Sequence, residues 1–91
     1  MRAPKVRQMM SPRSGGLVDN QFMLYTSEGV YFQSYNTLIA FESNNGEIFL
    51  DEGRWDFSRT TSRYRNIFLG LNTQETKSQI ESGEIKLIKL N

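Results

Sequence analysis

The sequence contains no cysteine and no histidine among its 91 residues. Without cysteine there can be no disulfide bridge and no thiolate zinc site. Without histidine the chain lacks the commonest general base and the commonest metal ligand. No apolar run approaches the roughly 20 residues that span a bilayer, or the core of a signal peptide. We therefore expect a soluble intracellular protein with no cofactor, no metal and no membrane partner.

Catalytic motifs are also missing, since the sequence has no G-x-S-x-G, no G-x-G-x-x-G and no P-loop. One enzymatic alternative is a metal-dependent nuclease, in which Asp51 and Asp56 hold Mg²⁺ and Lys86 of the Glu84-Ile85-Lys86 triplet orients water. Such triplets arise often by chance, and two predicted helices separate this one from the aspartates. We therefore expect a binding protein rather than an enzyme.

Charge is unevenly distributed, although the net charge is only +1. Residues 1–20 carry a net charge of +3, residues 21–53 carry five acidic residues and no Lys or Arg, and residues 54–66 return to +3. This asymmetry can steer a charged partner, or the basic and acidic segments can pair within the molecule.

The first 20 residues contain both prolines, a Gly15-Gly16 pair and no hydrophobic period. They predict an irregular basic arm, which is either a mobile terminus or a segment that orders on a partner. Arg7 and Arg13 of this arm are candidate contacts to a partner. The remaining residues, 21–91, predict a single domain, because a chain of this length has apolar material for one core.

Four segments from residue 21 combine aromatic and β-branched residues with turn signals between them, and they predict strands at 21–26, 30–35, 37–43 and 47–52. Asn45-Gly46 is the strongest hairpin signal. If its loop holds two residues, Ser43 faces Ile48 and Phe41 faces Leu50. Residues 84–91 predict one further strand at a sheet edge.

Two short helices are expected between residue 56 and Gly83. The first has three possible N-cap residues, an apolar stripe and a glycine suited to its end: Asp56, Ser58 or Thr60; Tyr64, Ile67, Phe68 and Leu71; and Gly70. The second begins with the capping-box pair Asn72 and Glu75. The predicted fold is thus α+β: an antiparallel sheet of four or five strands with two short helices on one side and the irregular basic N-terminal arm.

The start of the first helix is the candidate partner-binding surface. It comprises Arg54, Trp55, Arg59, Arg63, Tyr64 and Arg65. The helix period places Arg59 and Arg63, four residues apart, on one side of the apolar stripe and Arg65 on the other side. Guanidinium forks bind phosphates or carboxylates, and nearby rings, including Phe57, can stack on bases. Alternatively, the arginines lay their stems over the core and pair with acidic residues of the same chain. Contact with a protein, contact with nucleic acid and internal pairing all remain open.

The chain also resembles a family of small uncharacterised proteins from phages and mobile elements of Gram-positive bacteria. The resemblance covers about residues 20–91 and is carried by the blocks "FQSYNTLIA" and "WDFSRTTSRYRNIFLG". It implies an inhibitor of host defence, such as an anti-CRISPR protein, or a small regulator. Our leading hypothesis is a phage-type anti-defence protein in the host cytoplasm that docks on a nucleic-acid-handling complex such as a CRISPR effector. The alternative is a small DNA- or RNA-binding regulator.

Overall fold

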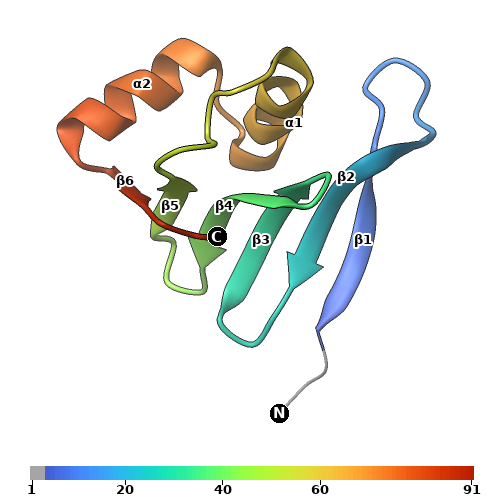
Figure 1. Ribbon diagram of the computed structural model, residues 1–91, viewed down its shortest axis with the longest axis horizontal. Helices are drawn as coiled ribbons and strands as arrows, with labels where there is room; N and C mark the ends of the chain where they lie inside the picture. Colours follow the sequence, from blue (N-terminus) through green and yellow to red (C-terminus); the bar gives the residue numbers. More distant parts are fainter. Residues whose placement is uncertain (1–3) are drawn as a thin grey trace.

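The computed structural model describes residues 4–91, so the first three residues of the predicted arm lie outside the described part. It contains a six-stranded sheet and two helices (Figure 1). The elements are β1 (Lys5–Met10), β2 (Leu17–Tyr25), β3 (Gly29–Ser34), β4 (Thr37–Ser43), β5 (Ile48–Asp51), α1 (Arg59–Leu69), α2 (Thr73–Ser82) and β6 (Ile85–Ile88). The α+β class is confirmed.

The sheet is mixed rather than wholly antiparallel. Strands β1 to β5 follow one another as an antiparallel meander, whereas β6 runs parallel to β5. Parallel neighbours need a long crossover connection, and α1 and α2 together supply it. The predicted antiparallel direction is therefore wrong for the last strand, because two helices return the chain to the end of the sheet at which β5 began.

The basic N-terminal segment is not irregular between residues 5 and 10. These residues form β1 at the sheet edge, where Lys5 is the partner of Tyr25. Met9 anchors the strand, since it is buried with 5% exposure in the main core. Pro4 and Pro12 lie before and after β1, at positions where a missing N–H does not interrupt the ladder. The prediction of an irregular arm is wrong here because the prolines delimit a strand.

The Asn45-Gly46 hairpin forms as predicted, but its two strands pair one residue away from the register expected for a two-residue loop. Gly46 has a φ of 88°, whereas Asn45 does not adopt a positive φ. The N–H of Ser43 donates to the carbonyl of Glu47 at 2.9 Å, so the loop spans residues 44–46. Phe41 consequently faces Phe49 instead of Leu50.

Both helix ends follow the local sequence signals. The Ser58 side chain caps α1, and Gly70 ends it in the left-handed region with a φ of 71°. Asn72 and Glu75 form a complete capping box at the start of α2, which ends at Gly83. Neither helix among residues 4–91 has the length and apolar character needed to cross a membrane.

The buried side of α1 differs from the predicted apolar stripe. Ile67 is 46% exposed, while Thr61 and Arg65 are fully buried. Thr61 faces a polar group of the sheet, because its hydroxyl lies 2.8 Å from the hydroxyl of Ser34. Phe68 does pack inward as expected.

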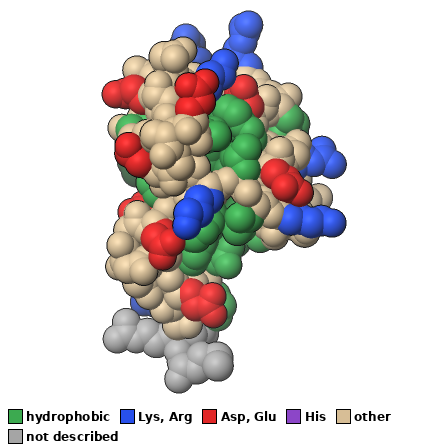
Figure 2. All heavy atoms as spheres, turned by 90° about the vertical axis from the view of Figure 1, so that its left-hand side faces the viewer, with side chains coloured by type: hydrophobic (Ala, Val, Ile, Leu, Met, Phe, Trp, Pro, Cys, Tyr) green, Lys and Arg blue, Asp and Glu red, His purple; other side chains and the backbone are tan. Residues whose placement is uncertain are grey.

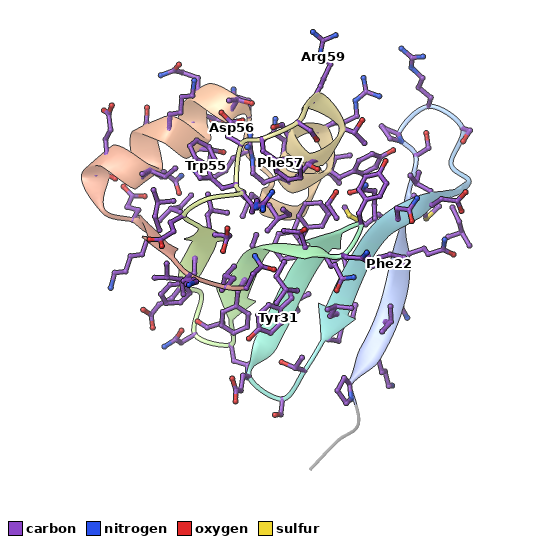
Figure 3. All side chains as sticks on the ribbon, in the orientation of Figure 1. Phe22, Tyr31, Trp55, Asp56, Phe57 and Arg59 are labelled. Carbon is purple, nitrogen blue, oxygen red and sulfur yellow. The ribbon has the colours of Figure 1, made fainter. Side chains whose placement is uncertain are left out.

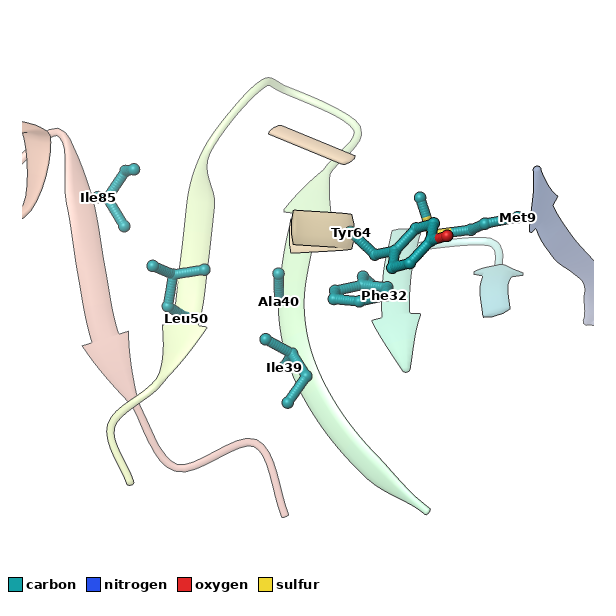
Figure 4. Close-up of a cluster of buried hydrophobic side chains, with 7 residues drawn as sticks. All are labelled: Met9, Phe32, Ile39, Ala40, Leu50, Tyr64 and Ile85. Atoms are coloured by element: carbon teal, nitrogen blue, oxygen red, sulfur yellow. The ribbon is translucent and has the colours of Figure 1, made fainter. Parts of the chain in front are cut away.

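The core lies between the helices and one face of the sheet. Its buried apolar members are Met9, Phe32, Ile39, Ala40, Leu50, Tyr64 and Ile85 (Figure 4). Helix α1 packs on this cluster through Phe68, whose ring stacks on Phe32 at 5.8 Å, and α2 packs on it through Ile80. Both helices therefore cover the same face of the sheet.

Candidate binding site

Four arginines occur in the loop that follows β5 and in the first two turns of α1. Arg54, Arg59 and Arg63 are exposed, whereas Arg65 is fully buried. Figure 3 shows the Arg59 side chain extending outward from the free end of α1, away from the sheet. The helix period that was predicted to separate Arg65 from Arg59 and Arg63 thus separates an interior arginine from two surface arginines.

Arg65 joins three segments of the chain. Its Nη1 donates to the carbonyl oxygen of Trp55 at 2.6 Å and to Oδ1 of Asp56 at 3.2 Å. Its Nη2 donates to Oδ1 of Asn66 at 2.9 Å and to Oγ1 of Thr73 at 3.2 Å. The guanidinium group therefore ties the loop before α1 to the first turn of α2, and it is not available at the surface for a partner.

The aromatic residues of the predicted surface are also largely used by the fold. Tyr64 is 6% exposed and belongs to the core, and Trp55 packs against that core. Phe57 is the exposed ring of this region, with 48% exposure, and the guanidinium of Arg54 lies 5.9 Å from its centre. Surface stacking in this region therefore rests on Phe57 and Arg54.

Internal pairing accounts for one arginine of the predicted surface. Among residues 4–91 a single ion pair forms, between Arg65 and Asp56. Arg59 and Arg63 are exposed and have no carboxylate at ion-pair distance within this part of the chain. Their charges remain free to meet an external anion.

A cleft of about 230 Å³ lies between β2 and the start of α1. It is lined by Val18, Arg59, Thr60, Arg63 and Tyr64. The first turn of α1 contains no acidic residue, so the positive end of the helix dipole adds to the two guanidinium charges. The cleft thus combines a cationic rim with a partly apolar lining, which suits a phosphate or carboxylate carried on a larger group. Val18 was not predicted, since nothing in the sequence places β2 beside α1, and Thr60 was predicted only as a possible N-cap residue.

The two arginines of the predicted arm lie in different places. Arg13 belongs to the loop between β1 and β2, which projects at the same end of the molecule as the start of α1 (Figure 1). Arg7 lies on β1 at the sheet edge, and its guanidinium is 5.9 Å from the centre of the Tyr25 ring. The structure therefore brings the loop of Arg13, but not the strand of Arg7, to the cleft end.

Acidic residues gather at the opposite end. The loop between β2 and β3 touches the loop between β4 and β5, because the side chain of Asn44 donates to the carbonyl of Ser27 at 2.7 Å. These loops carry the exposed residues Glu28 and Glu47, and Figure 1 shows both loops at the end away from α1. Glu28 and Glu47 thus lie at the end opposite Arg59 and Arg63, whereas Asp56 lies beside the start of α1 (Figure 3) and Asp19 follows the cleft residue Val18 in β2.

The acidic residues of the nuclease alternative have protein partners of their own. Asp51 is 4% exposed and accepts hydrogen bonds from the backbone N–H groups of Leu90 and Gly53. Asp56 accepts from Arg65, and Glu84 accepts from the hydroxyl of Ser82. In the part of the chain that is described, no three acidic side chains lie close enough together to hold one metal ion.

The fold and this surface define a small α+β protein with a cationic cleft at one end and acidic loops at the other. The profile of the Family of unknown function (DUF8033) matches residues 5–84, and the chain belongs to this family. The expected membership of an uncharacterised family is thereby confirmed, while the phage origin in Gram-positive bacteria stays a prediction. No curated protein and no solved structure matches the chain.

Proposed function

We propose that this protein works by stoichiometric binding and that Arg59 and Arg63 bind an anionic group of a partner macromolecule in the cleft beside α1. The observation that carries this proposal is the pair of exposed arginines without carboxylate partners at the cleft rim. They lie one helical turn apart, so both forks can reach one carboxylate or phosphate cluster.

The favoured partner is an acidic surface of a nucleic-acid-handling host protein complex, such as a CRISPR effector, which the protein would inhibit. The resemblance to phage proteins supports this choice. The charge distribution supports it as well, because Glu28 and Glu47 at the far end would repel a nucleic acid that ran along the molecule. A partner that carries its anion at one place avoids this repulsion.

The second candidate is a small DNA- or RNA-binding regulator. It is favoured by the exposed Phe57 ring beside Arg54, since an aromatic ring and a guanidinium plane both stack on unpaired bases. The same cleft arginines would then meet phosphates.

The test compares the double variant Arg59→Ala/Arg63→Ala with the control Lys77→Ala/Lys89→Ala, which removes the same charge from exposed positions elsewhere. Each protein is used to capture partners from a bacterial lysate. The affinity of every protein captured by wild type is then measured with the purified components. We expect one partner to bind the wild type and the control equally and to lose most of its affinity for the arginine variant. Equal binding by all three proteins would contradict the proposal.

Labelled single-stranded and double-stranded oligonucleotides separate the two candidates. If the protein binds nucleic acid, the logarithm of its binding constant must fall linearly with the logarithm of the salt concentration. The slope is about −0.9 for each phosphate neutralised on duplex DNA. If adding the protein leaves the fluorescence anisotropy of the labelled oligonucleotides unchanged at low salt, the regulator hypothesis is rejected.

Both Arg59 and Arg63 are exposed, so replacing them with alanine should leave the free energy of unfolding within about 0.5 kcal/mol of wild type. A larger loss would assign them to the fold instead.

A further inference from the structure

The face of the sheet opposite the helices carries a row of apolar side chains, flanked by the polar pair Gln8 and Gln33 on either side of Phe22. Register and alternation place one cross-strand row there, with the partners Val6 and Leu24, Leu24 and Tyr31, Tyr31 and Phe41, and Phe41 and Phe49. Phe22 lies on the same side of β2 as Leu24. We call these six residues (Val6, Phe22, Leu24, Tyr31, Phe41 and Phe49) the open face. Figure 3 shows Tyr31 on the side of the sheet away from α1 and α2.

The open face is a continuous surface rather than a set of scattered side chains. The ring centres of Tyr31 and Phe41 are 4.4 Å apart, and those of Phe41 and Phe49 are 6.1 Å apart. The sheet residues that pack on the core alternate with these rings, as Ala40 and Leu50 do. An antiparallel sheet with one solvated face usually places polar residues on that face. An apolar row across five strands therefore indicates a surface that another molecule covers.

The open face carries little charge. Lys86 of β6 is the register neighbour of Phe49. Two acidic residues share this side: Asp19, two residues after Leu17 in β2, and Asp51, which is 4% exposed and held by backbone N–H groups. No arginine of the described chain lies in the row, so a polyanion such as RNA would find one cation there for its phosphates. The partner that fits is an apolar, nearly neutral protein surface.

A second copy of this chain meets that requirement without charge repulsion. The six strands span roughly 24 Å and the paired segments roughly 17 Å, which gives a flat area of roughly 400 Å² before the relief of the side chains is counted. Met10 and Leu17, which are 59% and 68% exposed, extend the apolar area at the β1 edge beyond Val6. At the β6 edge Ile88, two residues after Lys86, is 37% exposed, and Figure 2 shows apolar side chains among charged ones on that side. Two copies packed through this face would bury roughly 800 Å² in total, plus these edge side chains, which is the range of weak interfaces that form at high protein concentration.

We propose that two copies of the protein pack through their open faces, forming a two-layered sheet sandwich with the helices on the outside. Sheets in such sandwiches lie about 10 Å apart and nearly aligned. The two-fold axis runs along the strands, so that β1 of one copy lies over β6 of its partner. This arrangement keeps the two copies of Lys86 apart, whereas an axis across the strands would stack them.

The first test measures the mass of the full chain by light scattering and by sedimentation at several concentrations. We expect wild type to show twice the 10.6 kDa of one chain at high micromolar concentration. Tyr31→Lys places a charge in the centre of the interface and should give the monomer mass. Val6→Lys repeats the test at a position that is 62% exposed, where the folding of the chain is not at risk. The matched control is Ile67→Lys, a 46% exposed apolar residue on α1, which should leave the dimer intact.

The outcomes separate this dimer from its alternatives. A monomeric wild type overturns the proposal, and so does a dimer that survives both Tyr31→Lys and Val6→Lys. Loss of the dimer in Ile67→Lys alone would place the interface on the helices. The chain has no cysteine, so Lys86→Cys allows one spin label per copy. We expect a broad label separation of about 25 Å, whereas about 10 Å would mean that β6 lies over β6. Arg59→Ala/Arg63→Ala should remain dimeric, which makes this test independent of the proposed function.

Discussion

The guanidinium group of Arg65 donates a 2.6 Å hydrogen bond to the backbone carbonyl of Trp55, and it lies 5.1 Å from the centre of the Trp55 ring. The backbone contact holds the loop that leads into α1, and the stacking contact shields the charge from water. A fully buried arginine needs such partners because an uncompensated charge in the interior is costly. This relationship makes Arg65 part of the fold rather than of the binding surface.

Arg65→Lys should therefore destabilise the protein by about 3 kcal/mol. A lysine cannot reproduce the planar fork that reaches Trp55 and Thr73 together. Urea unfolding followed by circular dichroism measures the change. The control is Arg59→Lys at an exposed position, which should stay within about 0.5 kcal/mol of wild type. Equal midpoints for the two variants would show that the buried contacts of Arg65 contribute nothing.

Gly29→Ala should be more destabilising than a glycine replacement in another turn. A Cβ at position 29 would lie 2.2 Å from the carbonyl oxygen of Glu42, and the φ of 152° is itself unfavourable for alanine. Backbone of β3 or β4 must then move, with an expected loss of at least about 2 kcal/mol. Gly46→Ala is the control, since its φ is 88° but no atom lies within 4 Å of the added Cβ. It should cost about 1 kcal/mol, and a Gly29 variant no worse than this would contradict the close approach.

Thr61→Val should cost about 1 to 3 kcal/mol, because the hydroxyl of Ser34 would lose its partner inside the core. The two hydroxyls lie 2.8 Å apart, and both residues are fully buried. Adding Ser34→Ala removes the hydroxyl that has lost its partner. The double variant should therefore lose less free energy of unfolding than the two single variants lose in sum. A double-mutant cycle from urea unfolding measures this coupling. Strictly additive losses would mean that the contact between the hydroxyls carries no energy.

Asp51 should contribute to the loss of stability in acid. Burial raises the pKa of Asp51, but hydrogen bonds from the Leu90 backbone, Asn91 and the Gly53 backbone outweigh it, and the pKa lies below its ordinary value of 3.8. A lowered pKa stabilises the folded state above 3.8, and this stabilisation is lost as the pH falls through the folded value. Asp51→Asn should thus be less stable than wild type at neutral pH, with the difference shrinking below pH 3.8. If the unfolding midpoints of Asp51→Asn and wild type differ by the same amount at neutral and at strongly acidic pH, Asp51 does not contribute to the loss of stability in acid.

The N-terminal segment and the Asn45-Gly46 hairpin show where sequence patterns stop being sufficient. Pro4, Pro12 and a mixed polar pattern suggest an irregular segment, yet β1 forms because Met9 reaches the core that the other strands build. The hairpin exists as predicted, but its loop is one residue longer than the simplest turn. That single residue sets which rings meet, because strand side chains alternate between faces.

The candidate site also combines features that the sequence predicted with features that only the packed structure shows. Helix periodicity predicted that Arg59 and Arg63 share one side of α1, and both are exposed there. The lining of the cleft by Val18 could not be predicted, since it depends on β2 and α1 meeting across more than 40 residues of chain. The same limit applies to the open face, whose apolar row exists only in the observed strand register.

The sequence by itself determined where α1 ends and where α2 begins and ends, because Gly70, Asn72 and Gly83 act through hydrogen bonds and backbone angles a few residues away. It narrowed the start of α1 to three N-cap candidates, of which the structure uses Ser58. It also determined that basic and acidic segments alternate along the chain. Only the tertiary structure decided that Arg65 is interior while Arg59 and Arg63 are free, since the three side chains are chemically identical. Their difference comes from the Trp55 carbonyl and the Thr73 hydroxyl, which reach Arg65 only after the loop and α2 have packed around it.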